Sequence, residues 1–131
     1  MPYMPMCHEV DPKQTLNEEI GDLSDFTVFY NEILVAVYLR PQKTKSGIIL
    51  TDQHRDEDKY QSKIGLVVKM GKDAFNDDTG KWDFGGTDVC LNSWVWHRPS
   101  DGFSVTVNGV LCRVLKDTSI RGTVAQPDMV W

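Results

Sequence analysis

Short runs of β-branched and aromatic residues, separated by turn signals, dominate this chain of 131 residues. The runs occupy residues 26–39, 64–70, 89–97, 103–107, 110–115 and 120–124. Such side chains favour strands, whereas Gly, Pro, Asn and Asp favour the turns between them. No apolar stripe at helical spacing extends over 12 residues or more. The pattern therefore predicts an all-β fold, a small barrel or sandwich.

Individual residues predict where some of these strands turn or end and which face their side chains occupy. Asn108-Gly109 predicts a two-residue hairpin between the fourth and fifth runs. The first run is expected to break at Asn31-Glu32 and to stop at Arg40-Pro41, because proline cannot donate to a ladder. Trp94 and Trp96 alternate along one strand, so both indoles point to the same face. We expect them in the core or at a subunit seam, not in a ligand pocket.

The chain is long enough for one domain, which we divide into an N-terminal arm (1–25), a barrel (26–124) and a C-terminal tail (125–131). The arm is polar and acidic apart from a weakly amphipathic patch around Leu16 and Ile20. This patch is typical of a short helix that cannot bury a face of its own. We therefore expect the arm to lie on something else.

Charge and hydropathy exclude several classes of partner. The chain carries 14 Lys and Arg against 19 Asp and Glu, a net charge of −5, and an acidic surface repels nucleic acid and anionic membranes. Its longest apolar run, residues 33–39, is far shorter than the roughly 20 residues that span a bilayer. No basic segment followed by an apolar stretch opens the chain, so we expect a cytoplasmic protein.

No set of residues predicts catalysis or a bound metal or cofactor. Three cysteines do not make a disulfide framework, and Cys90 and Cys112 are expected to pack as small hydrophobes. Cys7-His8-Glu9 places three possible ligands in a row, but adjacent residues rarely converge on one ion. Residues 77–83 lack the alternating ligands and closing glutamate of a calcium loop. We therefore expect no catalytic residue, metal or cofactor, and no enzyme.

The long polar segment 42–63 is the most informative feature for function. It contains three consecutive aliphatic residues, Ile48, Ile49 and Leu50. A flexible basic stretch precedes them, which consists of Lys43, Thr44, Lys45, Ser46 and Gly47. Two interpretations stay open from spacing alone. The tripeptide is either a short strand on the barrel's own surface or a recognition segment that orders in a partner's apolar groove.

The sequence resembles the small co-chaperonin family, the GroES-like or chaperonin-10 proteins. The most specific part is Lys-Thr-Lys-Ser-Gly-Ile-Ile-Leu at residues 43–50, followed after a polar stretch by Gly-Leu-Val-Val-Lys-Met-Gly at 65–71. The strands at 89–96 and 110–114 match only in pattern. The resemblance covers residues 30–124.

The resemblance implies a GroES-like quasi-β-barrel, usually in a ring of seven subunits. It also implies that residues 42–63 correspond to the mobile loop of the family. We call this segment the docking loop. Residues 43–47 are its hinge, and Ile48, Ile49 and Leu50 plug a groove on a large chaperonin ring. Residues 72–87 correspond to the roof hairpin. The subunit seam then consists of Thr27, Val28, Phe29 and Tyr30 from one subunit and the strand from Ile120 to Val124 of the next.

The chain also departs from the family. Leu91-Asn92-Ser93 stands where Val-Gly-Asp is usual, the docking loop carries a charged stretch at 55–59, and an arm and a tail are added. Such additions resemble the divergent co-chaperonin-like proteins of bacteriophages.

Two functions follow. The first is a non-enzymatic co-chaperonin in the host cytoplasm that caps a chaperonin ring and assists the folding of phage capsid protein. The alternative is a virion structural protein, a head-decoration or cement protein. In that case the arm and the tail ending in residues 129–131 would adhere to the major capsid protein. Both predict self-association into a ring or a lattice, because the two seam strands are apolar edges.

Overall fold

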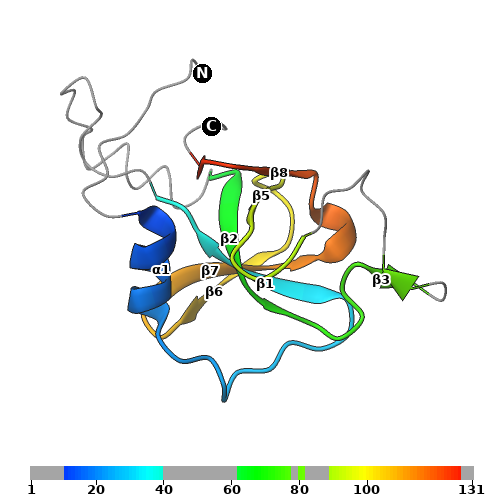
Figure 1. Ribbon diagram of the computed structural model, residues 1–131, viewed down its shortest axis with the longest axis horizontal. Helices are drawn as coiled ribbons and strands as arrows, with labels where there is room; N and C mark the ends of the chain where they lie inside the picture. The colour runs from blue at the N-terminus through cyan, green and yellow to red at the C-terminus, as the bar shows by residue number, and fades with distance from the viewer. Residues whose placement is uncertain (1–10, 40–61, 78–79, 82–88, 128–131) are drawn as a thin grey trace.

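The computed structural model describes residues 11–39, 62–77, 80–81 and 89–127 (Figure 1). Its main element is one antiparallel sheet in the strand order β6-β7-β1-β2-β5-β8. The strands are β1 (Glu32–Val37), β2 (Ile64–Met70), β5 (Trp94–Trp96), β6 (Phe103–Val107), β7 (Val110–Lys116) and β8 (Gly122–Val124). A separate hairpin contains β3 (Asn76–Asp77) and β4 (Gly80–Lys81), and the helices are α1 (Pro12–Ile20) and the 3-10 turn η1 (Asp117–Ser119). The predicted all-β class is confirmed.

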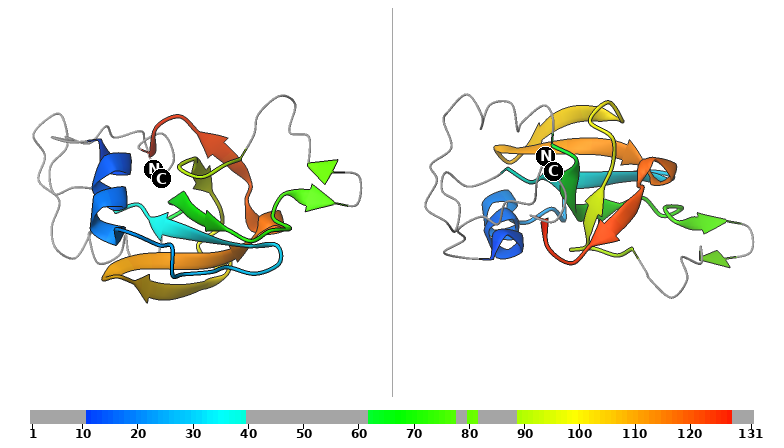
Figure 2. Two further views of the ribbon diagram at one scale, coloured as in Figure 1. Left: turned by 60° about the horizontal axis from the view of Figure 1, so that its bottom comes forward. Right: turned by 90° about the horizontal axis from the view of Figure 1, so that it is seen from above.

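The sheet curves around a central pair of strands, β1 and β2 (Figure 2). Their register shifts between Leu34 and Val35, which pair with Lys69 and Val67, so that one extra residue lies on β2. A bulge of this kind bends the strand and increases the local twist. The six strands therefore wrap round as a barrel.

The core consists of two apolar clusters, one on each side of β1. Leu34 and Ala36 belong to the first cluster, whereas Ile33 and Val35 belong to the second. Successive side chains of a strand point to opposite faces, so a strand buried on both faces has a continuous apolar run instead of an alternating one. This explains why the run at residues 33–37 carries no polar residue.

α1 lies against the first cluster. The side chain of Asp11 accepts a 2.9 Å hydrogen bond from the backbone N–H of Lys13, and Pro12 occupies the first turn, as is usual at a helix N-terminus. Ile20 is 2% exposed and packs with the strands. The expected short helix is present, and it lies on the barrel of its own chain. Among the described residues no helix is long and apolar enough to cross a membrane.

The predicted hairpin and the predicted place of the tryptophans are confirmed. Asn108 and Gly109 have φ angles of 51° and 82°, as a tight hairpin between β6 and β7 requires. Trp94 is buried and Trp96 is partly buried, and both pack in the first cluster. The ring of Trp94 meets that of Tyr38 edge-on, with centroids 5.7 Å apart.

The strand expected at residues 89–97 is much shorter. Only Trp94 to Trp96 belong to β5, because a turn precedes them, in which Asn92 has φ 70° and the backbone N–H of Ser93 donates to the carbonyl of Cys90. The expectation that Cys90 packs as a small hydrophobe is wrong, since this turn leaves it exposed. Cys112 is buried as expected.

Of the two expected seam strands, the first is absent and the second begins later in the chain than predicted. Residues 27–30 form no strand in the single chain, and β1 starts at Glu32, after Tyr30 has taken a left-handed φ of 59°. β8 starts at Gly122 instead of Ile120, because the backbone N–H of Ile120 still bonds to the carbonyl of Asp117 in η1. The break predicted near residue 31 is confirmed.

Candidate functional site

The structure describes the residues just before the docking loop, up to residue 39, and the last two residues of the loop, Ser62 and Lys63. The hinge (residues 43–47) and the tripeptide (residues 48–50) lie outside the described residues. The loop leaves the barrel after β1 and returns before β2, and the last pair of this ladder is Val37 with Gly65. The backbone N–H of Tyr38 donates to the carbonyl of Ile64 at 3.1 Å, so the two ends are held side by side.

A buried hydroxyl fastens the two ends together. Ser62 Oγ lies 2.9 Å from the carbonyl oxygen of Tyr38 and 3.1 Å from that of Ile64, and it can donate to either. Ser62 itself is buried, and the ring of Tyr38 is buried against Trp94. The base of the loop is therefore anchored in the core.

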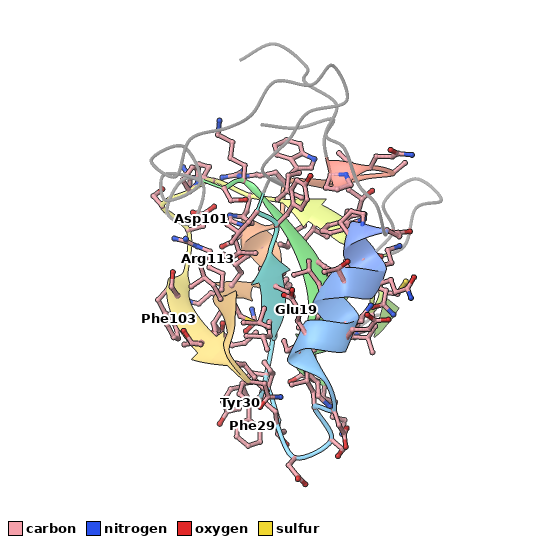
Figure 3. All side chains as sticks on the ribbon, turned by 90° about the vertical axis from the view of Figure 1, so that its left-hand side faces the viewer. Glu19, Phe29, Tyr30, Asp101, Phe103 and Arg113 are labelled. Atoms are coloured by element: carbon pink, nitrogen blue, oxygen red, sulfur yellow. The ribbon has the colours of Figure 1, made fainter. Side chains whose placement is uncertain are left out.

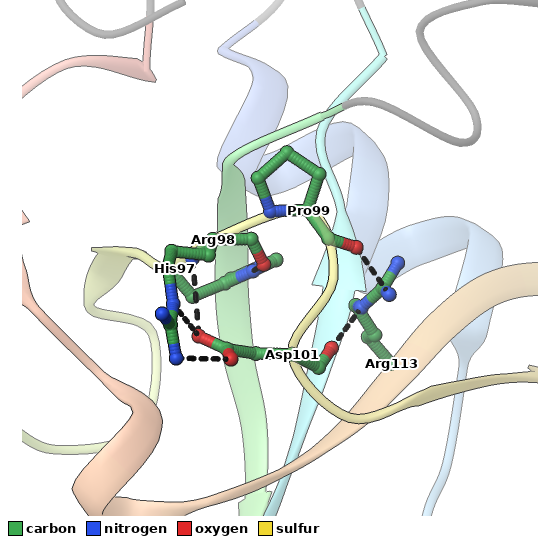
Figure 4. A network of polar contacts seen from close by, with 5 residues as sticks. All are labelled: His97, Arg98, Pro99, Asp101 and Arg113. Atoms are coloured by element: carbon green, nitrogen blue, oxygen red, sulfur yellow. Dashed lines mark hydrogen bonds and ion pairs between the residues drawn. The ribbon is translucent and has the colours of Figure 1, made fainter.

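A second anchor comes from the end of β5. The backbone N–H of His97 donates to the carbonyl of Lys63 at 2.9 Å. Residues 97–102 then cross from β5 to β6 (Figure 4). Arg113, on β7, donates from Nε to the carbonyl of Asp101 at 2.6 Å and from Nη2 to that of Pro99 at 2.5 Å.

The pKa values of two side chains in this crossing turn, His97 and Asp101, are both lowered. His97 is 2% exposed, and burial lowers the pKa of its imidazole, with the charge of Arg113 acting in the same direction. Its Nδ1 lies 2.8 Å from the carbonyl of Arg98, so Nδ1 carries the proton of the neutral ring. Burial works against ionisation of Asp101, but hydrogen bonds from the side chain and backbone of Arg98 lower the pKa of that carboxyl.

The roof hairpin lies at the opposite end of the β1–β2 pair (Figure 2). The predicted roof loop, residues 72–87, contains β3 and β4. Its base is held by the buried carboxylate of Asp117, which accepts from the backbone N–H of Phe75 at 3.0 Å and from Asn31 Nδ2 at 3.1 Å. Gly71 permits this packing, since a Cβ there would lie 2.1 Å from the carbonyl oxygen of Tyr30.

The predicted seam residues divide into buried and exposed ones. Phe29 and Tyr30 are 68% and 74% exposed and project from the barrel (Figure 3), and Thr27 is also exposed. Val28, Ile120 and Val124 are partly buried against the core clusters. The described chain does not pair the two segments, because β8 pairs with β5 and residues 27–30 form no strand.

A comparison with protein-family models matches residues 25–124 to the chaperonin 10 Kd subunit. The chain belongs to this family. The match covers the sheet, both ends of the docking loop and the roof hairpin, whereas α1 precedes it. The resemblance inferred from the sequence and the GroES-like barrel are confirmed. No curated protein matched the chain in a sequence comparison.

Membership of the chaperonin 10 family indicates co-chaperonin function, with a large chaperonin ring as the partner and with self-association. Co-chaperonins of this family are not enzymes. In the part of the chain that the structure describes, no three His, Cys, Asp or Glu side chains lie together as a metal site would need.

Sequence reasoning missed the residues that hold the loop base. Ser62 lies in a polar segment, and His97 ends the predicted strand 89–97, so neither residue is distinguished in the sequence. Of these residues, only Arg113 stands out in the sequence, because it is a charged residue inside the apolar run 110–115. A buried cation in a strand must find partners, but the sequence does not tell where they lie.

Proposed function

We propose that the protein caps a chaperonin ring through the docking loop, with Ile48, Ile49 and Leu50 as the docking residues. The observation that carries the proposal is the clamp between Tyr38 and Ser62, which fixes both points of attachment of the docking loop side by side at one end of a family barrel. Residues 43–47 act as the hinge and the polar residues after Leu50 as the tether.

Energetics favour a repeated, weak contact. Burial of one aliphatic side chain contributes roughly 1.5–3 kcal/mol, and ordering the loop opposes this gain. One loop therefore binds weakly. Several loops on one ring bind strongly, because each later contact is intramolecular.

The ring itself would form through the predicted seam. Residues 27–30 of one subunit add to the free edge of β8 in the next, between Ile120 and Val124. This pairing is supported by the place of β8 at the end of the sheet and by the exposed side chains of Phe29 and Tyr30. Closed rings leave no bare edges.

An Ile49→Asp variant tests the docking role. A charge in an apolar groove is costly, so the variant should no longer be recovered with the host chaperonin in a pull-down. Thr51→Asp adds the same charge to the same loop outside the tripeptide and should still bind. Circular dichroism should show an intact barrel in both. Recovery of Ile49→Asp at the parent level would refute the docking assignment.

In this proposal the folding client is phage capsid protein and the site of action is the host cytoplasm. The virion structural role needs a free adhesive arm, yet α1 packs on its own barrel, with Ile20 in the core. This packing supports the co-chaperonin role. Mass spectrometry of purified virions of a phage that encodes the chain separates the two roles, since stoichiometric presence in mature particles would favour the structural one.

A further inference from the structure

We propose that Arg113 is a positioning residue for the docking loop, which acts through the crossing turn, residues 97–101. Arg113 holds the turn, and the turn holds Lys63 at the base of the loop. This inference rests on the proposed docking role of residues 48–50. It adds a residue on β7 that is distant from the loop in sequence and does not belong to the docking segment.

The first step is the topology of the crossing turn. β5 and β6 are separated in the sheet by β2, β1 and β7, so residues 97–102 must cross these strands to reach Phe103, which pairs with Val114 on β7. Carbonyl groups in such a passage need donors. Arg113 supplies them, since its guanidinium reaches the carbonyls of both Pro99 and Asp101 (Figure 4). Arg113 is 9% exposed, so these bonds form in a poorly solvated place.

The second step is the rigidity of the turn. The carbonyl of Arg98 accepts from the backbone N–H of Asp101 at 3.1 Å and from Nδ1 of His97 at 2.8 Å. The carboxylate of Asp101 in return accepts from the backbone N–H of Arg98 at 3.3 Å and forms an ion pair of 3.2 Å with its guanidinium. These bonds close residues 97–101 into one hydrogen-bonded unit.

The third step joins this unit to the docking loop. β5 and β2 pair as far as Trp96 and Ile64, and the hydrogen bond from His97 to Lys63 extends the ladder to the last residue before β2. If the turn moves, this bond is lost, and the loop base keeps the hydrogen bonds by which Tyr38 is joined to Ser62 and to Ile64. The direction in which the loop joins the barrel at Lys63 is then less restricted.

The effect on binding depends on how often the loop points in a direction that allows the tripeptide to bind. A loop whose base takes several directions presents the tripeptide correctly for a smaller fraction of the time. The apparent dissociation constant rises by the inverse of that fraction. Arg113 should therefore change affinity for the chaperonin although it does not contact the partner's groove.

The test compares Arg113→Met with Lys116→Met, which removes an exposed positive charge from the other end of β7. Hydrogen exchange of backbone amides is measured by NMR, and affinity for the host chaperonin by titration. In Arg113→Met the His97 amide should exchange about tenfold faster, while the Tyr38 amide, held at the other side of the base, changes less. The dissociation constant should rise about tenfold, as expected for a competent fraction of about one tenth. Lys116→Met should match the parent protein.

A loss of stability alone must be separated from positioning. Ile33→Val weakens the core at the end of β1 opposite the loop base, where Ile33 is fully buried and pairs with Met70, and serves as the destabilised control. If it binds as weakly as Arg113→Met, the positioning role is refuted. Sedimentation of each variant verifies that self-association is unchanged.

If Arg113→Met does not fold, Asp101→Ala replaces it. This variant opens the turn by removing the acceptor for Arg98 and leaves no buried cation unpaired. It should raise both the exchange rate of the His97 amide and the dissociation constant. Unchanged exchange, or weaker binding with a fully protected His97 amide, would overturn the inference. The exchange result does not depend on the docking residues, so it stands even if Ile49→Asp binds normally and the proposed function fails.

Discussion

Asn108 Nδ2 donates a 2.7 Å hydrogen bond to the carbonyl oxygen of Ile20 and so joins the β6–β7 hairpin to the end of α1. A second asparagine pair also joins α1 to a turn, because Asn17 Nδ2 in the helix donates to Asn92 Oδ1 at 3.0 Å. Helix ends carry carbonyls without intrahelical partners, and a turn side chain satisfies one of them here. Although α1 precedes the family match, it is fastened to the barrel at two turns.

Asn108→Ala should lower the free energy of unfolding by about 2 kcal/mol. The change removes the hydrogen bond to Ile20, worth about 1 kcal/mol, and puts alanine at a left-handed position, which costs about 1 kcal/mol more. Asn108→Gly keeps the turn and loses only the bond, so it should lose about half as much. Urea unfolding followed by circular dichroism measures both. An Asn108→Ala variant as stable as the parent would show that α1 is not held by this contact.

His97 should make the protein less stable in mild acid. Burial lowers the pKa of its imidazole in the folded state, whereas in the unfolded chain the pKa stays near 6.5. Below that value the unfolded chain therefore binds more protons than the folded one, and stability falls as the pH falls. The fall continues until the pH reaches the lowered folded pKa. Urea midpoints between pH 8 and pH 5 should show it.

His97→Asn isolates this contribution from those of the other histidines. An asparagine amide can donate to the carbonyl of Arg98 without taking up a proton. The variant should lose part of the pH dependence that the parent protein shows between pH 8 and pH 5. Identical slopes in the two proteins would mean that His97 does not titrate differently in the two states.

The two described cysteines should differ in reactivity. Burial raises the pKa of the Cys112 thiol to about 11, and the residue is fully buried, so the reactive thiolate is scarce and inaccessible. Cys90 is exposed in the turn before β5. Iodoacetamide at pH 8, followed by mass spectrometry of peptides, should label Cys90 in the folded protein and both residues in denaturant. Labelling of Cys112 at the rate of Cys90 would contradict the buried position.

Phe29→Glu should abolish self-association and leave the single barrel folded. The side chain is 68% exposed in the single chain, so its loss costs the monomer little, but a charge at an apolar seam opposes pairing. Phe103→Glu is the matched control, since Phe103 is 60% exposed on β6, at the other edge of the sheet. Sedimentation at micromolar concentration should show a smaller species only for Phe29→Glu. If both variants gave the smaller species, the assignment of Phe29 to the subunit seam would be refuted.

Much of the barrel could be predicted from the sequence because its signals are local. The runs that became β1, β2, β6 and β7 contain residues that favour strands, and Asn108-Gly109 favours one kind of turn. Where a local signal was ambiguous, the prediction failed. The apolar run at residues 89–97 shortened to β5 because Asn92 took a left-handed φ that its neighbours did not reveal. The family motifs at residues 43–50 and 65–71 were also readable, since they are contiguous in the chain.

The tertiary structure decided which distant groups meet. Arg113 reaches the carbonyls of Pro99 and Asp101 only because the curved sheet brings the crossing turn to β7. α1 meets the Asn108 turn only because the folded sheet places the β6–β7 hairpin beside the end of the helix. Such contacts depend on how the strands are ordered and bent, which no window of neighbouring residues encodes. The sequence by itself determined most of the strands, the hairpin and the family of this protein. The anchored base of its docking loop is a property of the folded sheet.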